Sequence, residues 1–231
     1  EKAGLSPSVG DFVYDSDLKR LQRYSGSLWV GVANGYGVLS LTSSIGEPTF
    51  YTSYTLAIAS ASTGDTIIQY GNIEDSSNTT ININKSLTIN LNGFTYTNSS
   101  TGTSDAIQIS TTGKVKILSG TIKRINGTYG TTSNRAIVLT AGGNLELTGT
   151  DVINTTGLSL YSTGTGTKVF NGRFITTTQT INQVSVNSTA SLVNSVFESS
   201  AYNNFQGVLY NVKATSTTGS TLIGTTSEAV E

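Results

Sequence analysis

The sequence predicts an all-β fold: a parallel β-helix, which is a solenoid of stacked coils, behind a short capping helix and a small N-terminal β meander. Three observations predict it. A bend motif recurs every twenty-odd residues, short β-branched segments lie between the bends, and Ser, Thr, Asn and Gly are abundant while Pro occurs twice in 231 residues. We divide the chain into a small module at 1–32, a linker at 33–49 and the β-helix with its helix at 50–231.

The first module is predicted from residues 10–32, GDFVYDSDLKRLQRYSGSLWVGV, in which three short apolar runs alternate with turn-forming residues. We expect a meander whose aromatic and leucine side chains form one compact cluster. Three strands are marginal as a free domain, so packing against a partner or a neighbouring chain is expected. The cluster would consist of Phe12, Tyr14, Leu21, Tyr24 and Trp29.

This stretch resembles a unit that recurs in bacteriophage tail fibres and tailspikes and in some bacterial surface proteins. The resemblance is carried by Gly10, the Tyr14–Asp15 pair, Gly26 and Trp29, while Ser16 stands where the unit has Thr. In those proteins the unit precedes or connects larger β-structured parts. The resemblance therefore implies an attachment or connector role for residues 1–32.

After the linker, residues 51–62 (YTSYTLAIASAS) predict a short amphipathic helix with Tyr54, Leu56 and Ile58 or Ala59 on related faces. Residues 64–93, which include GDTIIQYGNIED and NTTININKSLTINLNG, resemble the opening coil of pectin-lyase-like right-handed β-helices. In that family a helix in this place commonly caps the first coil. The resemblance spans roughly residues 50 to 225 and implies the fold rather than an activity.

The bend motif has a fixed internal spacing. From an apolar residue at position i, a small turn-former stands at i+2 and a second apolar residue at i+5. Gly and Asn tolerate the left-handed backbone that a sharp bend needs; Ser does so less well, so Gly120 is the alternative to Ser119. The residues at i+2, called elbows below, are Gly93, Ser119, Gly149, Asn171, Asn194 and Asn211.

Between the elbows lie further strand-like segments at 106–110, 136–140, 158–162 and 183–186. Each coil would then hold at least two short strands, and stacking would pair each strand with the coils above and below. A β-sandwich of hairpins is the alternative, but it does not require the same elbow six times.

The motif also predicts which charged side chains stack. Position i−1 points outward, so Lys116, Glu146 and Lys168 should form a column of alternating charge on coils about 4.8 Å apart. Position i+4 places Asp151 beside Arg173.

Catalysis is not expected. Glycan hydrolysis needs two carboxyl groups roughly 5 to 10 Å apart, one of them protonated. Between residues 76 and 227 the carboxylates are Asp105, Glu146, Asp151 and Glu198, and the predicted stacking gives Glu146 and Asp151 a cation each. The chain has neither His nor Cys, which removes the commonest bases, thiol nucleophiles and thiol metal sites. We predict no catalytic residue, metal or cofactor, with Asp105 and Glu146 as the alternates.

Positive charge gathers in one stretch without any acid, between Asp105 and Glu146. On an outward face it could hold an acidic polysaccharide or lipopolysaccharide phosphate, and a locally unpaired, solvated coil is the alternative. The candidate glycan-binding residues are Lys114, Lys116, Lys123, Arg124, Arg135 and the aromatic Tyr129.

Composition limits the remaining functions. Charged residues make up 12% of the chain and the net charge is −1, which does not support nucleic-acid binding. The apolar runs are too short to span a bilayer. The chain begins at Glu1 and lacks Met, so we expect a processed chain or a piece of a longer one.

These features lead us to expect a structural and adhesive virion protein. It would be a phage tail fibre, tailspike or head fibre at the virion surface that binds host surface polysaccharide and contacts other virion proteins through residues 1–32. The family resemblance implies a homotrimer. A polysaccharide depolymerase of the same architecture and a bacterial surface adhesin are the alternatives.

Overall fold

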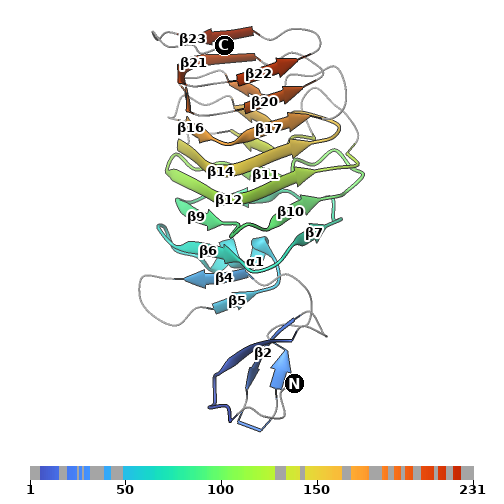
Figure 1. Ribbon diagram of the computed structural model, residues 1–231, viewed down its shortest axis with the longest axis vertical. Coiled ribbons are helices and arrows are strands. Elements are labelled where there is room, and N and C mark those ends of the chain that lie inside the picture. The colour runs from blue at the N-terminus through green and yellow to red at the C-terminus, as the bar shows by residue number, and fades with distance from the viewer. Residues whose placement is uncertain are drawn as a thin grey trace.

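The computed structural model consists almost entirely of β-strands, most of which pair in parallel with strands from neighbouring layers of the same assembly (Figure 1). The expectation of a mostly β fold is thereby confirmed. The structure describes residues 6–15, 20–24, 26–27, 29–31, 39–42, 49–127, 134–140, 144–162, 168–176, 184–186, 190–193, 196–199, 204–210, 213–216 and 221–224.

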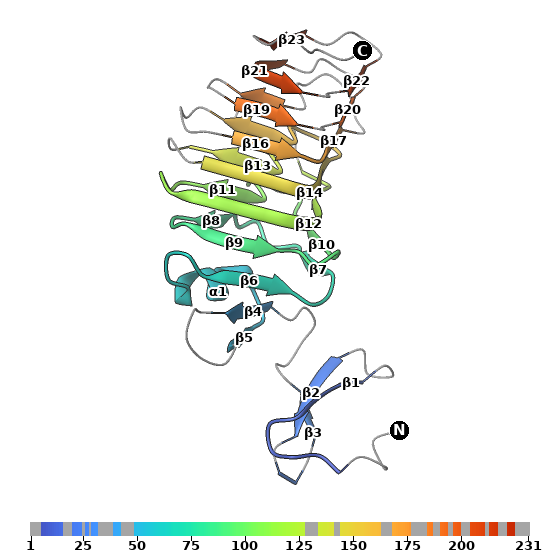
Figure 2. The ribbon, with the colours of Figure 1, turned by 60° about the vertical axis from the view of Figure 1, so that its left-hand side comes forward.

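The parallel strands form three columns, and Figure 2 shows part of the first column from the side. The first column contains β6 (Thr66–Gln69), β9 (Leu87–Asn90), the first halves of β12 (Lys114–Arg124) and β14 (Asn144–Asn154), β16 (Lys168–Asn171), β19 (Ala190–Val193) and the end of β21 (Asn204–Tyr210). The second contains β7 (Ile73–Asp75), β10 (Thr95–Asn98), the second halves of β12 and β14, β17 (Arg173–Thr176), β20 (Val196–Ser199) and β22 (Lys213–Ser216). The third contains β8 (Ile81–Ile83), β11 (Ile107–Ile109), β13 (Ile137–Leu139), β15 (Leu160–Ser162), β18 (Val184–Val186), the start of β21 and β23 (Thr221–Gly224).

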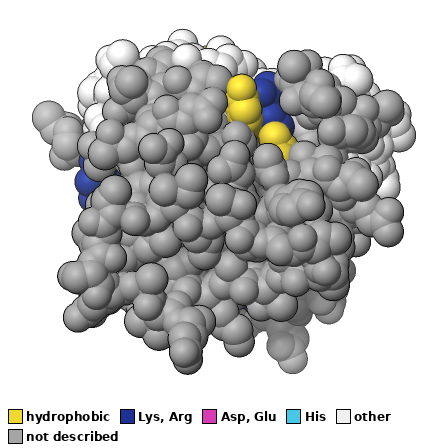
Figure 3. All heavy atoms as spheres, turned by 90° about the horizontal axis from the view of Figure 1, so that it is seen from above, with side chains coloured by type: hydrophobic (Ala, Val, Ile, Leu, Met, Phe, Trp, Pro, Cys, Tyr) yellow, Lys and Arg dark blue, Asp and Glu magenta, His cyan; other side chains and the backbone are white. Residues whose placement is uncertain are grey.

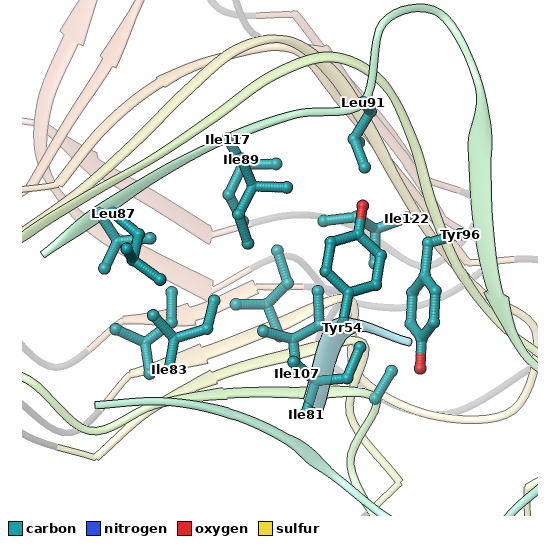
Figure 4. Packing of buried hydrophobic residues seen from close by; sticks show 14 of the residues in the cluster. Tyr54, Ile81, Ile83, Leu87, Ile89, Leu91, Tyr96, Ile107, Ile117 and Ile122 are labelled. Carbon is teal, nitrogen blue, oxygen red and sulfur yellow. The ribbon is translucent and has the colours of Figure 1, made fainter. Parts of the chain in front are cut away.

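Apolar side chains stack along each column and meet in one buried core. Strand alternation sends every second residue inward, so neighbouring layers place like residues on top of one another. Figure 4 shows this packing around the first layers. The buried stacks are Ile67, Ile89, Ile117 and Leu147 in the first column, Tyr96, Ile122, Val152 and Phe174 in the second, and Ile81, Ile107, Ile137 and Leu160 in the third.

The corners between the first and second columns lie at the elbows. The backbone is left-handed at Gly93 (φ 80°), Ser119 (φ 52°) and Gly149 (φ 59°). Serine itself therefore adopts this conformation at position 119. Gly120 has a different reason to be glycine, because a Cβ there would lie 2.5 Å from the Cβ of Leu91.

The remaining elbows differ from these. Asn171 ends β16 and is not among the described residues with positive φ. The bend there falls on Gly172, where a Cβ would lie 2.1 Å from the carbonyl oxygen of Thr150. Asn194 and Asn211 lie outside the described residues.

Corner length varies between layers, which shifts two of the predicted stacks. Residues 91–94 lie opposite residues 119–120, so Ile89 rather than Leu91 pairs with Ile117. One residue is lost at the corner after β16, so Phe170 rather than Val169 pairs with Leu147. The fixed i to i+5 spacing fails at these two corners, although the stack at i+5 is continuous.

A helix and an antiparallel strand cover the end of the core nearest the N-terminus. Helix α1 (Tyr54–Ser60) starts at Ser53, whose Oγ accepts a hydrogen bond from the backbone N–H of Leu56 at 3.3 Å. It buries Tyr54, Ala57 and Ile58. The prediction that Leu56 lies on the same face is wrong, because Leu56 is 54% exposed. The ring of Tyr54 meets that of Tyr96 edge-on at 5.5 Å between centroids.

The segment expected to be a linker contributes a strand to this end. Strand β4 (Leu39–Thr42) pairs antiparallel with β6 and with β5 (Thr49–Tyr51), and it buries Leu39 and Leu41. It covers the free edge of β6, which the parallel columns leave without a partner below.

The N-terminal module is the expected three-stranded antiparallel meander, formed by β1 (Phe12–Asp15), β2 (Arg20–Tyr24) and β3 (Trp29–Gly31). Its aromatic cluster differs from the prediction. Phe12 and Tyr14 are 48% and 57% exposed, because the face they share is open. Phe12 instead meets the ring of Phe50 at 5.5 Å. The side chains of Leu21 and Trp29 lie outside the described part.

Candidate functional site

Three of the predicted charged residues come together on the first column. The Cα atoms of Lys116 and Glu146 are partners across β12 and β14, as the motif predicts. The Nζ of Lys114 lies 2.6 Å from Glu146 Oε2, and that of Lys116 lies 3.8 Å from it. The hydrogen bond from Lys114 lowers the pKa of Glu146. Glu146 is therefore held ionised, which is the wrong state for a general acid.

The predicted column of alternating charge stops at Glu146. The Cα of Lys168 pairs with Leu145, and Val169 takes the position opposite Glu146. The cause is the shorter corner after β16, which moves this strand by one residue. The second predicted pair is present, since Arg173 Nη1 lies 3.7 Å from Asp151 Oδ2.

Arg124 does not face outward, contrary to the expectation for a glycan-binding residue. Its side chain is fully buried at the end of β12, at the level of Asn98 and Asn154 in the neighbouring layers. Burial lowers the pKa of its guanidinium. The guanidinium donates hydrogen bonds to the backbone carbonyls of Ser100 (2.7 Å), Ile125 (2.7 Å), Gly102 (3.0 Å), Ser104 (3.3 Å) and Asn98 (3.4 Å).

Arg135 is also engaged inside the fold. Its Nε and Nη2 donate to the two carboxylate oxygens of Asp105 at 2.9 and 2.6 Å, and its backbone N–H donates to the same carboxylate at 2.8 Å. The guanidinium carbon lies 4.8 Å from the ring centroid of Tyr161. Asp105, the other catalytic alternate, thus serves to fix the start of the strand that Arg135 precedes.

The basic band consequently offers little free charge to an acidic glycan. Two of its cations share the carboxylate of Glu146, and both arginines bind groups of the fold. Lys123 is partly exposed on the outer side of β12. Tyr129 lies outside the described residues.

A pocket that the sequence did not predict lies at the N-terminal end of the columns. It has a volume of about 390 Å³, within the size range of small-molecule sites. It lies between the segment that leads into α1 and the chain from β7 to β8. Its walls are formed by Thr52, Ser53, Tyr54, Thr55, Ile73, Glu74, Asp75, Ser76, Ser77, Thr79, Ile81 and Tyr96.

Hydrogen-bonding groups fill one side of this pocket. Asp75 Oδ1 accepts from the backbone N–H and the hydroxyl of Ser77, at 2.9 and 2.5 Å. The hydroxyls of Ser77 and Thr79 lie 2.6 Å apart. Glu74 is exposed at the rim. Among the ion pairs formed by described residues, none includes Glu74 or Asp75.

Tyr96 links the pocket to the core. Its side chain is 1% exposed, and burial, followed by the nearby charge of Asp75, raises the pKa of its hydroxyl. Figure 4 shows the rings of Tyr54 and Tyr96 side by side with their hydroxyls pointing in opposite directions. Tyr54 Oη donates to Gln69 Oε1 at 2.6 Å, whereas no described residue meets hydrogen-bond geometry with Tyr96 Oη.

Figure 3 gives the view onto the opposite end of the columns, in which hydrophobic side chains and Lys or Arg side chains of described residues lie next to one another. The carboxylates predicted as a possible catalytic pair lie between residues 76 and 227, a range that excludes Glu74 and Asp75 of this pocket. The sequence feature that could have indicated the pocket is the pair Glu74 and Asp75, followed directly by the hydroxyl-rich run 76–80.

In the part of the chain that the structure describes, no helix is long and apolar enough to cross a membrane, and no three acidic side chains are grouped to hold a metal ion. Comparison with known proteins found no matching family model, no matching curated protein and no matching solved structure.

Proposed function

We propose that the chain is a right-handed parallel β-helix that forms the body of an adhesive fibre protein on a virion. In this proposal it is part of a tail fibre, tailspike or head fibre and binds host surface glycans. The observation that carries the proposal is the register: three columns of parallel strands continue through successive layers over one buried core. Right-handed crossovers are the rule for parallel strands in one sheet, which supports the handedness.

This architecture suits an adhesive rod. Each layer contacts only its neighbours, so the assembly grows in one dimension and presents long polar faces. Polar residues occupy three of the four outward positions on the second halves of β12 and β14, namely Thr121, Lys123 and Asp151, beside Ile153. Many shallow contacts on such a face can add up to firm attachment when several chains act together.

The same residues argue for binding without cleavage. A glycosidase keeps one carboxyl group protonated near neutral pH, usually by burial away from cations. Glu146 has two lysines within 4 Å and a lowered pKa, and Asp105 is held by the guanidinium of Arg135. Glu146 is thereby stabilised in the ionised form, and both carboxylate oxygens of Asp105 already accept hydrogen bonds from Arg135, so neither group is placed to protonate a substrate.

The small module offers a surface for assembly. Val9, Phe12 and Tyr14 are exposed large hydrophobic side chains, and such groups mark contact surfaces. In the proposal this module joins the body to other virion proteins, and three chains associate. Light scattering of the purified chain should give the mass of a trimer.

The direct test is adsorption and cleavage measured together. The intact oligomer should coat cells of the host strain, compete with the particle for adsorption and leave purified capsule or lipopolysaccharide at its original length. An oligomer that does not adsorb to the host surface would refute the adhesive role. Shortening of the polymer, abolished by Glu146→Gln or Asp105→Asn, would replace it with the depolymerase.

A further inference from the structure

We propose that the pocket between the segment 52–55 and the chain from β7 to β8 binds one neutral sugar unit of the recognised glycan. This inference rests on the proposed glycan adhesion and gives it a specific site. The pocket has the volume of a small-molecule site and is lined by hydroxyls, two carboxylates and two tyrosines. Three properties of the pocket indicate which class of ligand it binds.

The first property is an excess of hydrogen-bond acceptors. Ionised carboxylates only accept hydrogen bonds, and a carboxylate has room for about four of them. Asp75 uses one oxygen for Ser77, and neither Asp75 nor Glu74 forms an ion pair with a described residue. A ligand rich in O–H donors would satisfy these acceptors. Sugar hydroxyls are such donors, and each can also accept from the seryl and threonyl hydroxyls of the wall.

The second property is the buried hydroxyl of Tyr96. Buried polar atoms are almost always paired, and an unpaired one needs an explanation. Tyr96 Oη has Asp75 and Asn98 nearby but no hydrogen bond of good geometry to any described residue. Tyr96 also lines the pocket. The hydroxyl is closed off from solvent, so a ligand oxygen that enters beside Asp75 would supply the missing partner once the side chains covering the hydroxyl move aside, and Tyr96 would then fix the orientation of the sugar.

The third property is the distribution of charge and apolar surface. Ile73 and Ile81 form an apolar part of the wall, which can contact the C–H face of a sugar ring. The two carboxylates give the pocket negative charge without a described cation to offset it, so uronic acids, sialic acids and phosphates are repelled. This selectivity is the opposite of the one that the basic band indicated in the sequence.

The test uses the full chain and free sugars. Saturation-transfer NMR and calorimetry would compare the methyl glycosides of glucose, galactose and mannose with glucuronic acid and N-acetylneuraminic acid. We expect at least one neutral glycoside to bind and both acids to fail. Tyr96→Phe keeps the ring and removes only the hydroxyl, so it should weaken neutral-sugar binding about three- to tenfold without lowering thermal stability.

A second variant and a control complete the experiment. Glu74→Gln changes an exposed rim residue and should weaken the same ligand and reduce the exclusion of acidic sugars. Asp151→Asn, which alters a partly exposed carboxylate on the second column outside the pocket, should leave binding unchanged. Absence of neutral-sugar binding, or equal affinity in both pocket variants and the wild type, would overturn the inference.

The outcomes separate the two proposals. If the wild type and both pocket variants adsorb equally to host cells while no neutral glycoside binds, the pocket inference fails and the adhesive function stands. If a neutral glycoside binds in the predicted manner but the oligomer does not adsorb to host cells, the pocket inference stands and the adhesive virion role fails.

Discussion

Replacement of the buried Arg124 by methionine should destabilise the fold and loosen the chain between β10 and β11. Among the described residues, no carboxylate accepts a hydrogen bond from the guanidinium, which instead holds backbone carbonyls at residues 98–104 together with the carbonyl of Ile125. Methionine fills much of the same volume, so the change mainly removes hydrogen bonds. The carbonyls on which Arg124 converges would then be left in a site that methionine keeps dry.

The magnitude follows from the three short contacts, at 2.7, 2.7 and 3.0 Å. Each has a charged donor and is worth about 1.5–3 kcal/mol, and a carbonyl left unpaired in the interior costs about 1–3 kcal/mol. The desolvation of the buried charge, which also disappears, acts in the opposite direction. We expect a net loss of about 2–4 kcal/mol, which corresponds to a fall in melting temperature of roughly 5–12 °C.

Urea unfolding and hydrogen exchange would measure this change. Amides in 99–106 should exchange faster in the variant, and the unfolding midpoint should fall. The matched control is Lys123→Met, one residue earlier on β12 and facing outward, which should change stability by less than about 0.5 kcal/mol. An Arg124→Met protein as stable as this control, with unchanged exchange at 99–106, would refute the assigned role.

Three further outcomes test the corner geometry and the ion pairs. Gly149→Val should cost about 1–2 kcal/mol in urea unfolding because φ is 59° there, whereas Gly71→Val, in open space with no positive φ, should cost far less. Glu146→Gln should lose about 0.2–1 kcal/mol at pH 7. Because Lys114 lowers the folded-state pKa of Glu146, this difference should vanish as the pH falls through that lowered value; a constant difference down to about pH 2 would contradict the pair. Asp105→Asn should cost about 2 kcal/mol or more in thermal melts, since it leaves a mostly buried guanidinium without its charge partner, and a neutral result would contradict this.

The sequence predicts the interior stack well where the spacing is constant. The positions at i+5 form one continuous column through Tyr96, Ile122, Val152 and Phe174, because each lies a fixed distance into its second strand. The pairing predicted for position i was wrong for Leu91 and Val169. A motif of fixed length cannot account for a corner that has gained or lost residues.

Arg124 could have been placed from the sequence. It stands at i+7 of its repeat, as do Asn98 and Asn154, and i+5 and i+7 point to the same side of a strand. When the same inward position is polar in three successive layers, its side chains are expected to bind the loop that follows the strand. Asn154, for example, accepts from the backbone N–H groups of Thr156 and Gly157 and donates to the carbonyl of Leu158.

The pocket could not have been derived in the same way. It depends on how far α1 extends over the first layer and on the path of residues 76–79 between two strands, and neither has a periodic signal. The antiparallel strand β4 could not be predicted for a related reason: its sequence pattern is short, and the strand edge that it covers appears once in the fold.

The corner at 91–94 shows that a corner of this fold can change in length without changing how the strands beside it pair. It holds two more residues than the corner beside it, yet the strands on both sides keep their pairing with the next layer. A foreign peptide grafted between Asn92 and Gly93 would therefore project from the side of the stacked strands with its flanks already anchored. Repetition of the graft at the equivalent corners would display copies of that peptide at the spacing of the layers, about 4.8 Å apart, which leaves room for a ladder of short extended peptides and not for folded domains.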